Sequence, residues 1–207
     1  MSQAVCFGLL RHAETVWNRQ QRIQGRMDSP LTKHGIDSCR RWGKFLASPS
    51  WSWKRIICSP AGRARETARL INEALGIEIE TADDLREQDW GAWEGLTMAD
   101  IAGRYREQVE RLERSGWNFR PPSGESRSEV GSRASDALRT YEDLYPGQRI
   151  LVISHQTVIK SLIYAVEKRR FLPEEPELIG KNRLHTIVLS DGRFAAGRYN
   201  IDPAEPA

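Results

Sequence analysis

Three short apolar runs of this chain each lead into residues that could bind or attack a charged group. The first run ends at Arg11 and His12, the second leads to Arg63, and the third ends at His155. A neutral imidazole is a good nucleophile toward phosphorus, and guanidinium groups clamp phosphoryl oxygens and offset their charge. Two histidines and two arginines around one point, with no carboxylate among them, suit a phosphate group.

These four residues can meet only if the runs are neighbouring strands. Residues 5–10, 55–58 and 149–154 are short apolar runs with many β-branched side chains, a pattern typical of buried strands in a mainly parallel sheet. Such sheets bind ligands beyond the carboxyl ends of their strands. We therefore predict an α/β fold in which the three strands lie side by side.

The segments between the strands predict the elements that cover the sheet. Amphipathic pattern or helical propensity predicts helices at about 32–46, 62–75, 97–114, 125–145 and 157–166. Thr32 is the candidate N-cap of the first helix, and Gly76 is the candidate C-cap of the second. Residues 77–80 predict a short strand, and residues 184–190 and 194–199 predict a hairpin. Residues 15–31 and 83–95 are expected to be irregular.

Composition limits the class of protein. A chain of 207 residues can bury a full core, so we expect one domain over residues 1–202 and a disordered tail at 203–207. The net charge is +3 and the arginines are scattered, so no nucleic-acid partner is expected. Three cysteines are a sparse, odd set that favours a reducing cytoplasm. Neither a membrane-spanning run nor a signal peptide is visible, so we expect a cytoplasmic protein without a membrane partner.

Other chemistries for the histidine and arginine set are weaker. Two guanidinium groups would repel a divalent cation, and no aspartate or cysteine completes a metal site. The Gly-x-Ser-x-Gly elbow of a serine hydrolase is missing, as are the glycine-rich loops that bind nucleotides. Phosphoryl transfer to a histidine remains, with no metal and no cofactor. It requires a nearby carboxylic acid to protonate the departing alkoxide.

Five blocks of the sequence resemble, in order, the motifs of the histidine phosphatase superfamily in its phosphoglycerate-mutase-like branch. They are RHAETVWN at 11–18 with RIQG at 22–25 and DSPLT at 28–32, SPAGRA at 59–64 with TA at 67–68, LRE at 85–87 with WGAWEG at 90–95, GES at 124–126, and SH at 154–155. A lone Arg-His pair would mean little. Five ordered blocks that span nearly the whole chain make the resemblance specific.

The resemblance implies a three-layer α/β/α sandwich with a mainly parallel central sheet, and it implies a role for each residue of the site. His12 is the nucleophile that becomes phosphohistidine. Arg11, Arg63 and His155 bind the phosphoryl group, and His155 also stabilises the transition state. Glu87 is the general acid for the leaving group and then the base that activates water.

The same resemblance places further residues around the substrate. It implies that Asn18 contacts a phosphate oxygen. Ala13 and Gln156 stand where the family usually has glycine, and the Gln156 side chain could narrow the pocket mouth or contact the substrate. The residues expected to border the substrate are Gln24, Gly25, Glu125, Ser126 and Gln156.

The favoured function is a phosphomonoesterase that hydrolyses a small phosphorylated metabolite. The segment between Glu87 and Gly124 is short, so little of a lid protects a phosphohistidine from water. A cofactor-dependent phosphoglycerate mutase is the alternative, followed by a catalytically silent module that binds a phosphorylated ligand. Buried structural histidines and an exposed loop carboxylate at Glu87 are the non-catalytic interpretations. The sequence leaves open which ester is the substrate, and a homodimer is one open option for the oligomeric state.

Overall fold

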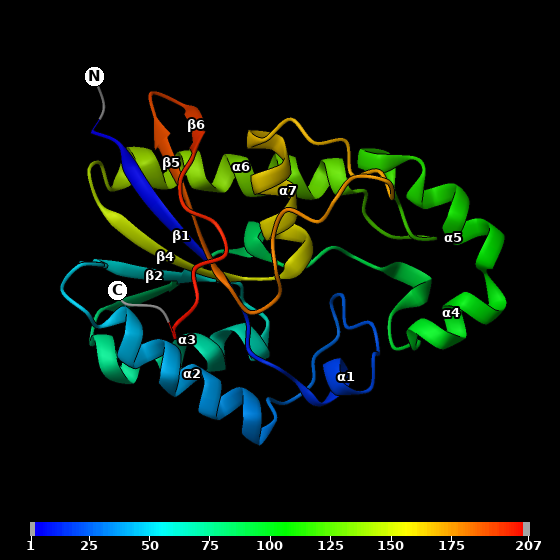
Figure 1. Cartoon of the computed structure of the whole chain (residues 1–207), viewed down its shortest axis with the longest axis horizontal. Coiled ribbons are helices and arrows are strands. Elements are labelled where there is room, and N and C mark those ends of the chain that lie inside the picture. The colour runs from blue at the N-terminus through cyan, green and yellow to red at the C-terminus, as the bar shows by residue number, and fades with distance from the viewer. Residues whose placement is uncertain (1–2, 205–207) are drawn as a thin grey trace.

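The computed structural model describes residues 3–204 and contains one sheet of six strands in the order β3-β2-β4-β1-β5-β6 (Figure 1). Four neighbouring strands, β3, β2, β4 and β1, are parallel, whereas β5 and β6 are antiparallel to their neighbours. The predicted mainly parallel sheet is confirmed. The strands are β1 (Val5–Arg11), β2 (Arg55–Cys58), β3 (Glu78–Thr81), β4 (Arg149–Ser154), β5 (Leu184–Ser190) and β6 (Arg193–Ala196).

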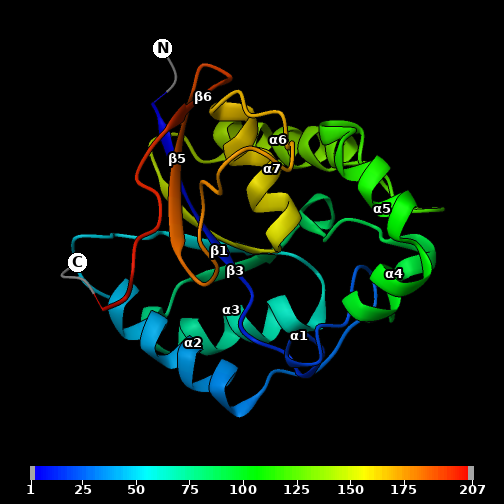
Figure 2. The same ribbon diagram turned by 45° about the vertical axis from the view of Figure 1, so that its right-hand side comes forward.

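Helices cover both faces of the sheet, which gives the three layers (Figures 1 and 2). One face carries α2 (Lys33–Leu46) and α3 (Gly62–Leu75), and the other carries α6 (Arg127–Leu144) and α7 (Gln156–Val166). Side chains alternate between the faces of a strand. In β4, Ile150 and Val152 therefore join the core under α6 and α7, while Leu151 and Ile153 join the core under α2 and α3.

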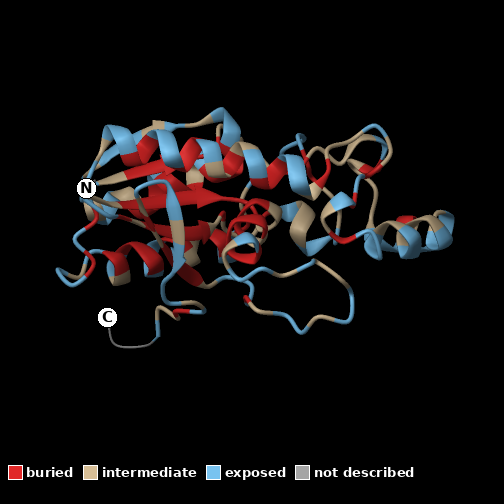
Figure 3. Ribbon diagram, turned by 90° about the horizontal axis from the view of Figure 1, so that it is seen from above, coloured by how far each residue is buried: buried red, intermediate tan, exposed pale blue. Residues whose placement is uncertain are grey.

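Burial is concentrated in the sheet and on the inner faces of these helices (Figure 3). Trp51 and Trp53 are buried and stack with their ring centroids 5.7 Å apart, so they act as core packing. The ring of Trp53 lies directly on Gly8 of β1, where an added Cβ would come within 2.4 Å of it. A side chain at position 8 would displace this tryptophan from the core.

Most predicted helix ends agree with the structure. The Thr32 hydroxyl accepts the Gly35 amide proton at 3.0 Å as the N-cap of α2, and Gly76 adopts φ +60° as the C-cap of α3. The helix predicted from residue 125 begins instead at Arg127, because Ser126 is its N-cap in a capping box with Glu129.

Four other predicted segments differ from the structure. The expected irregular stretch 15–31 contains a short helix, α1 (Val16–Arg19), and stretch 83–95 contains the 3₁₀ turns Asp83–Leu85 and Gly91–Trp93. The helix expected at 97–114 is two helices, α4 (Met98–Arg104) and α5 (Arg106–Glu113), with a break at Tyr105. Strand β6 ends at Ala196 rather than 199, because both residue 197 and residue 198 then pair with the backbone of Thr186, as in a bulge.

Helices α4 and α5 extend to one side of the sheet (Figures 1 and 2). They pack on a small separate cluster built around Trp93, Ile101 and Phe119. Another 3₁₀ turn, Gly116–Asn118, leads from this region toward α6. Trp93 of this cluster belongs to the segment that follows Glu87, so the cluster supports one wall of the site.

The predicted disordered tail falls mostly outside the described residues. Its first two residues, 203 and 204, form a turn, and residues 205–207 are not described. Among residues 3–204, no helix has both the length and the apolar character needed to cross a bilayer.

Candidate active site

The predicted phosphate-binding residues meet at the carboxyl edge of β2, β4 and β1. Arg11 pairs with Ser154 in the parallel register of β1 and β4. The ladder continues one step further, because the His12 amide donates to the Ser154 carbonyl at 2.9 Å. On the other side of β4, the Ser59 amide donates to the Ile153 carbonyl at 2.9 Å. The residues that follow all three strands are therefore held side by side by backbone hydrogen bonds.

His12 is buried, and its proton is held on a defined nitrogen. Nδ1 lies 2.8 Å from the Ala13 carbonyl oxygen. A carbonyl can only accept, so Nδ1 carries the proton and Nε2 keeps its lone pair. Burial, followed by the charges of Arg11 and Arg63, lowers the pKa of His12 well below its ordinary value. His12 is therefore a neutral imidazole with a free Nε2, which is the form a nucleophile requires.

His155 lies next to it, with the two ring centroids 5.2 Å apart. Its Nδ1 is 3.3 Å from Nη2 of Arg63, and its Nε2 is 2.7 Å from Oγ of Ser59. Arginine has no acceptor, so Nδ1 accepts and Nε2–H donates to the serine. Burial, and then the charge of Arg63, lowers the pKa of His155 well below its ordinary value. The second histidine is thus also neutral in the free protein.

Arg63 is buried in α3 and anchored on the loop that precedes α2. Its Nη2 donates to the Gly25 carbonyl at 2.9 Å, and Nη1 donates to the Met27 carbonyl at 2.8 Å and to Asp28 Oδ1 at 3.1 Å. The Arg63 backbone amide also donates to the Asp28 carboxylate. Asp28 therefore fixes both the start of α3 and the guanidinium of Arg63. The Nε of Arg63 is buried without a partner among the described residues.

Arg11 has no such anchor. Its guanidinium makes no hydrogen bond with the residues that the structure describes, and its Nε is buried. Burial has the largest effect on the pKa of Arg11 and lowers it. The charge of Glu87 raises this pKa, and the charge of Arg63 lowers it. Hydrogen-bond donors that are unpaired and desolvated favour an incoming anion. Arg11 and His12 share a cavity of about 420 Å³, which is open to a ligand of that kind.

Glu87 lies in the loop after the Asp83–Leu85 turn, close enough to Arg11 to act on its charge. Its Oε1 accepts the amide proton of Gln88 at 2.8 Å. The loop is tied to α6 by Arg133, which donates to the Glu87 carbonyl at 3.2 Å and grips Glu125 through Nε and Nη2 at 2.7 and 2.9 Å. Arg133 therefore connects the candidate general acid to the scaffold.

The residues predicted to border the substrate divide into two groups. Asn18 and Gln156 line the cavity with His12, whereas Gln24 donates to the Thr15 hydroxyl at 2.9 Å behind it. Gly25 contributes through its carbonyl, which holds Arg63. Glu125 is paired with Arg133, and Ser126 caps α6. For these two, as for the others, contact with a substrate stays a prediction.

No role was predicted from the sequence for four residues that take a direct part in this geometry. Ser59 and Asp28 stand inside motif blocks, so their positions were a usable signal. Lys181 lines the cavity of His12 from the segment before β5, and Arg133 is one of many helical arginines. Nothing in the local sequence pattern distinguishes Lys181 and Arg133 from the other lysines and arginines of the chain. Among residues 3–204, no three His, Cys, Asp or Glu side chains gather closely enough to hold a metal ion.

Comparison with known proteins agrees with this geometry. The family model of the histidine phosphatase superfamily (branch 1) matches residues 7–202. The chain belongs to this superfamily. It is 32% identical to the protein named "Uncharacterized phosphatase PhoE" of Bacillus subtilis (strain 168), over 96% of this chain and 92% of that protein. It is 34% identical to the protein named "Probable phosphoglycerate mutase GpmB" of Serratia proteamaculans (strain 568), over 76% of this chain and 73% of that one.

Solved structures give the same result. Bacillus stearothermophilus YhfR superposes with a TM-score of 0.86 at 30% identity, over 96% of this chain and 98% of that one. A mycobacterial glucosyl-3-phosphoglycerate phosphatase superposes with a TM-score of 0.82 over 95% and 99% of the two chains, and at 24% identity it shows the shared fold alone. Membership of the superfamily makes this chain an enzyme of the phosphatase or mutase type that acts on a small phosphorylated substrate.

Proposed function

We propose that this protein is a phosphomonoesterase that needs no metal or cofactor and that forms a phosphohistidine at His12. One observation carries the proposal: Nε2 of His12 is free of protons and lies beside the unpaired guanidinium of Arg11. A nucleophile next to unpaired anion-binding donors suits attack on a phosphoryl group.

In the first step, the His12 Nε2 lone pair attacks phosphorus while the bond from phosphorus to the alcohol oxygen breaks. That oxygen leaves with the bonding electron pair and takes a proton from the Glu87 carboxylic acid. Arg11 and Arg63 offset the charge that spreads over the phosphoryl oxygens. The products of this step are the free alcohol, the Glu87 carboxylate and a phosphoryl group on Nε2.

In the second step, the Glu87 carboxylate takes a proton from water as the water oxygen attacks phosphorus. The phosphorus–nitrogen bond breaks and its electron pair returns to Nε2. The net reaction consumes one water and one ester and yields alcohol and phosphate. Glu87 and His12 return to their starting protonation states, so no further reactant is required.

Access of water favours hydrolysis over transfer to a second hydroxyl group. A mutase must keep water away from its phosphohistidine. Of the described residues of α4 and α5, Met98 alone lines the cavity of His12, and 52% of its surface is exposed. These two helices pack on their own small cluster instead. The phosphoryl group on His12 would therefore be open to water.

A phosphoglycerate mutase remains the second candidate, supported by the printed name of the 34% identical relative. It would use the same His12 and the same arginines but return the phosphoryl group to another hydroxyl. Conversion of 3-phosphoglycerate to its 2-isomer without release of phosphate would establish this activity and overturn hydrolysis.

The test is phosphate release from a panel of phosphomonoesters in the presence of EDTA. We expect release by the wild type, none by His12→Ala, and an unchanged rate for His34→Ala, a matched control at an exposed histidine of α2. Rapid acid-free quenching and mass spectrometry should detect one phosphoryl group on the wild type. Equal release by His12→Ala would overturn the proposal, and binding of phosphate without any turnover would indicate the silent module.

A further inference from the structure

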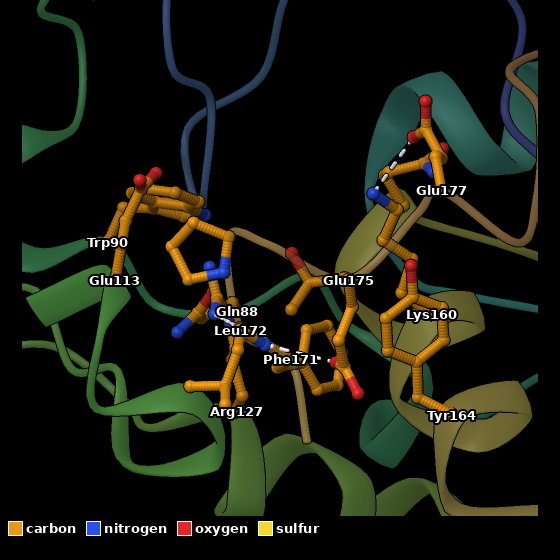
Figure 4. Close-up of a pocket in the computed structure, with 13 residues that line it drawn as sticks. Gln88, Trp90, Glu113, Arg127, Lys160, Tyr164, Phe171, Leu172, Glu175 and Glu177 are labelled. Carbon is orange, nitrogen blue, oxygen red and sulfur yellow. Dashed lines mark hydrogen bonds and ion pairs between the residues drawn. The ribbon is translucent and has the colours of Figure 1, made fainter. Parts of the chain in front are cut away.

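A second cavity, of about 340 Å³, is lined by side chains from the segment after Glu87, from α6 and α7, and from the segment that follows α7 (Figure 4). Gln156, at the start of α7, lines both cavities, and Gln88, the neighbour of Glu87, lines the second. Arg127 of α6 and Lys160 of α7 contribute from the helical layer. The volume lies in the range of pockets that hold organic ligands. Because Gln156 lines both, the second cavity adjoins the one that contains His12.

Gln88 carries a buried acceptor that nothing in the described structure satisfies. The residue is 1% exposed, and its Nε2 donates to the Glu125 carbonyl at 2.7 Å. A carbonyl only accepts, so this bond fixes which end of the amide is nitrogen. Oε1 then points elsewhere and has no hydrogen-bond partner. Buried acceptors are normally paired, and Gln88 is one of the residues that line the second cavity, so an occupant with an O–H or N–H donor could supply the partner that this oxygen lacks among the described residues.

Arg127 provides hydrogen-bond donors, but its positive charge is balanced by a neighbouring carboxylate. Its guanidinium lies between the rings of Phe119 and Phe171, at 4.2 and 4.9 Å from their centroids. Nη1 donates to the Gly116 and Phe171 carbonyls, which leaves Nη2 without a hydrogen bond to the described residues. Burial lowers the pKa of Arg127 to about 10, and the charge of Glu113 opposes that shift. The nearby carboxylate offsets the positive charge of this arginine.

The other charges of the lining are also matched or negative. Lys160 is 3.0 Å from Glu177, and Glu175 accepts backbone amides at the far wall. The three carboxylates of the lining outnumber its two cations. Glu175 also lies 3.5 Å from Nε of Arg169, so the charges are balanced, and a leaving group with a second anionic group would meet no excess of positive charge here.

The lining of the cavity combines hydrogen-bond acceptors and donors with the Trp90 ring (Figure 4). Each hydroxyl group of a sugar both donates and accepts, so a set of hydroxyls can pair with such a lining. We propose that the second cavity is the leaving-group subsite and takes a neutral, polyhydroxylated alcohol, with Gln88 accepting one of its hydroxyl protons. The substrate is then a sugar or polyol monophosphate without a second anionic group. This inference rests on the proposed phosphatase function.

The test compares kcat/KM for glucose 6-phosphate and sorbitol 6-phosphate with 3-phosphoglycerate, fructose 1,6-bisphosphate and p-nitrophenyl phosphate. The last has no hydroxyl on its leaving group and reports on the catalytic centre alone. We expect the two neutral polyol esters to exceed 3-phosphoglycerate and the bisphosphate by about tenfold or more, the equivalent of one good hydrogen bond or one uncompensated charge.

Gln88→Met keeps the length of the side chain but removes the acceptor, together with the Nε2 donor to the Glu125 carbonyl. It should lower kcat/KM for the polyol esters by about tenfold and leave p-nitrophenyl phosphate within about twofold. Gln3→Met is the matched control, at an exposed glutamine before β1. Glu113→Gln is a second variant that keeps an acceptor and removes a negative charge. It should raise the relative rate with 3-phosphoglycerate about threefold.

The outcomes separate the two proposals. If p-nitrophenyl phosphate is hydrolysed but the polyol esters are not preferred, the subsite inference is overturned and the phosphatase stands. The inference also fails if Gln88→Met slows all esters equally, because that pattern indicates a structural role. If the wild type releases phosphate from none of the five esters, the phosphatase proposal itself fails.

Discussion

Nη2 of Arg63 lies 3.3 Å from Nδ1 of His155, and this one contact defines the protonation of the second histidine. Since arginine cannot accept, the imidazole must accept at Nδ1 and donate at Nε2, where the Ser59 oxygen lies 2.7 Å away. Arg63 of α3, His155 after β4 and Ser59 after β2 thus form a chain of three side chains that holds His155 neutral and oriented.

Replacing Ser59 with alanine should destabilise the fold. The change leaves the His155 Nε2–H buried and unpaired, and a switch to the other tautomer would aim Nδ1–H at the Arg63 guanidinium. An unpaired buried donor costs about 1–3 kcal/mol, which for a chain of this size lowers Tm by roughly 2–10 °C. Thermal unfolding followed by circular dichroism measures the shift. Ser50→Ala, at an exposed serine after α2, is the control, and an equal Tm for Ser59→Ala and wild type would contradict the argument.

Binding of a tetrahedral dianion should raise the pKa of His155. In the free protein that pKa is lowered by burial and by the charge of Arg63. A dianion between the arginines favours the imidazolium form, so binding takes up protons and tightens as the pH falls. Sulfate is the suitable probe because it does not itself titrate near neutral pH. Calorimetry in buffers of different ionisation enthalpy should show proton uptake at pH 6.5 that is lost in His155→Gln. Proton release by the wild type would exclude this coupling.

Stability should fall as the pH drops below about 6.5. Burial lowers the pKa of His12 and of His155 and lowers that of His185 to about 4. The unfolded chain therefore binds protons more readily than the folded one between pH 6.5 and those lower values. The stabilising effect is present above pH 6.5, and each histidine removes about 1.4 kcal/mol per pH unit below it. Urea unfolding at pH 7.5, 6.5, 6.0 and 5.5 measures this slope, and a free energy of unfolding that rises toward pH 5.5 would show that the sign is wrong.

The sequence predicts the strand ends that position the candidate phosphate-binding residues, for a physical reason. Strands β2 and β4 end where predicted, because each is an apolar run that stops at polar residues, and a parallel sheet brings such ends together. The break at Tyr105 has only Gly103, two residues earlier within α4, as a local signal, and no proline. The burial of Gln88 and its unpaired oxygen depend on contacts made 37 residues away. Local pattern holds no information on such pairings.

Arg133 is the clearest example of a residue whose role the local sequence pattern does not predict, because that role arises entirely from tertiary contact. It joins α6 to the carbonyls of Asp84 and Glu87 and pairs with Glu125. Arg133→Met should loosen the loop that carries Glu87 and weaken protonation of the leaving group. We expect kcat for an alkyl phosphate to fall about tenfold or more, as for loss of a positioned acid, with KM changed less.

A good leaving group gives the discriminating measurement for Arg133. The p-nitrophenolate ion departs with little help from an acid, so kcat for p-nitrophenyl phosphate should fall far less than kcat for the alkyl ester. Arg139→Met is the control, because Arg139 is an exposed arginine of α6 that pairs with Asp136 on the same helix. An equal loss for both esters would mean that Arg133 stabilises the fold without positioning the acid. A loss confined to the alkyl ester would establish Arg133 as the positioning residue of Glu87.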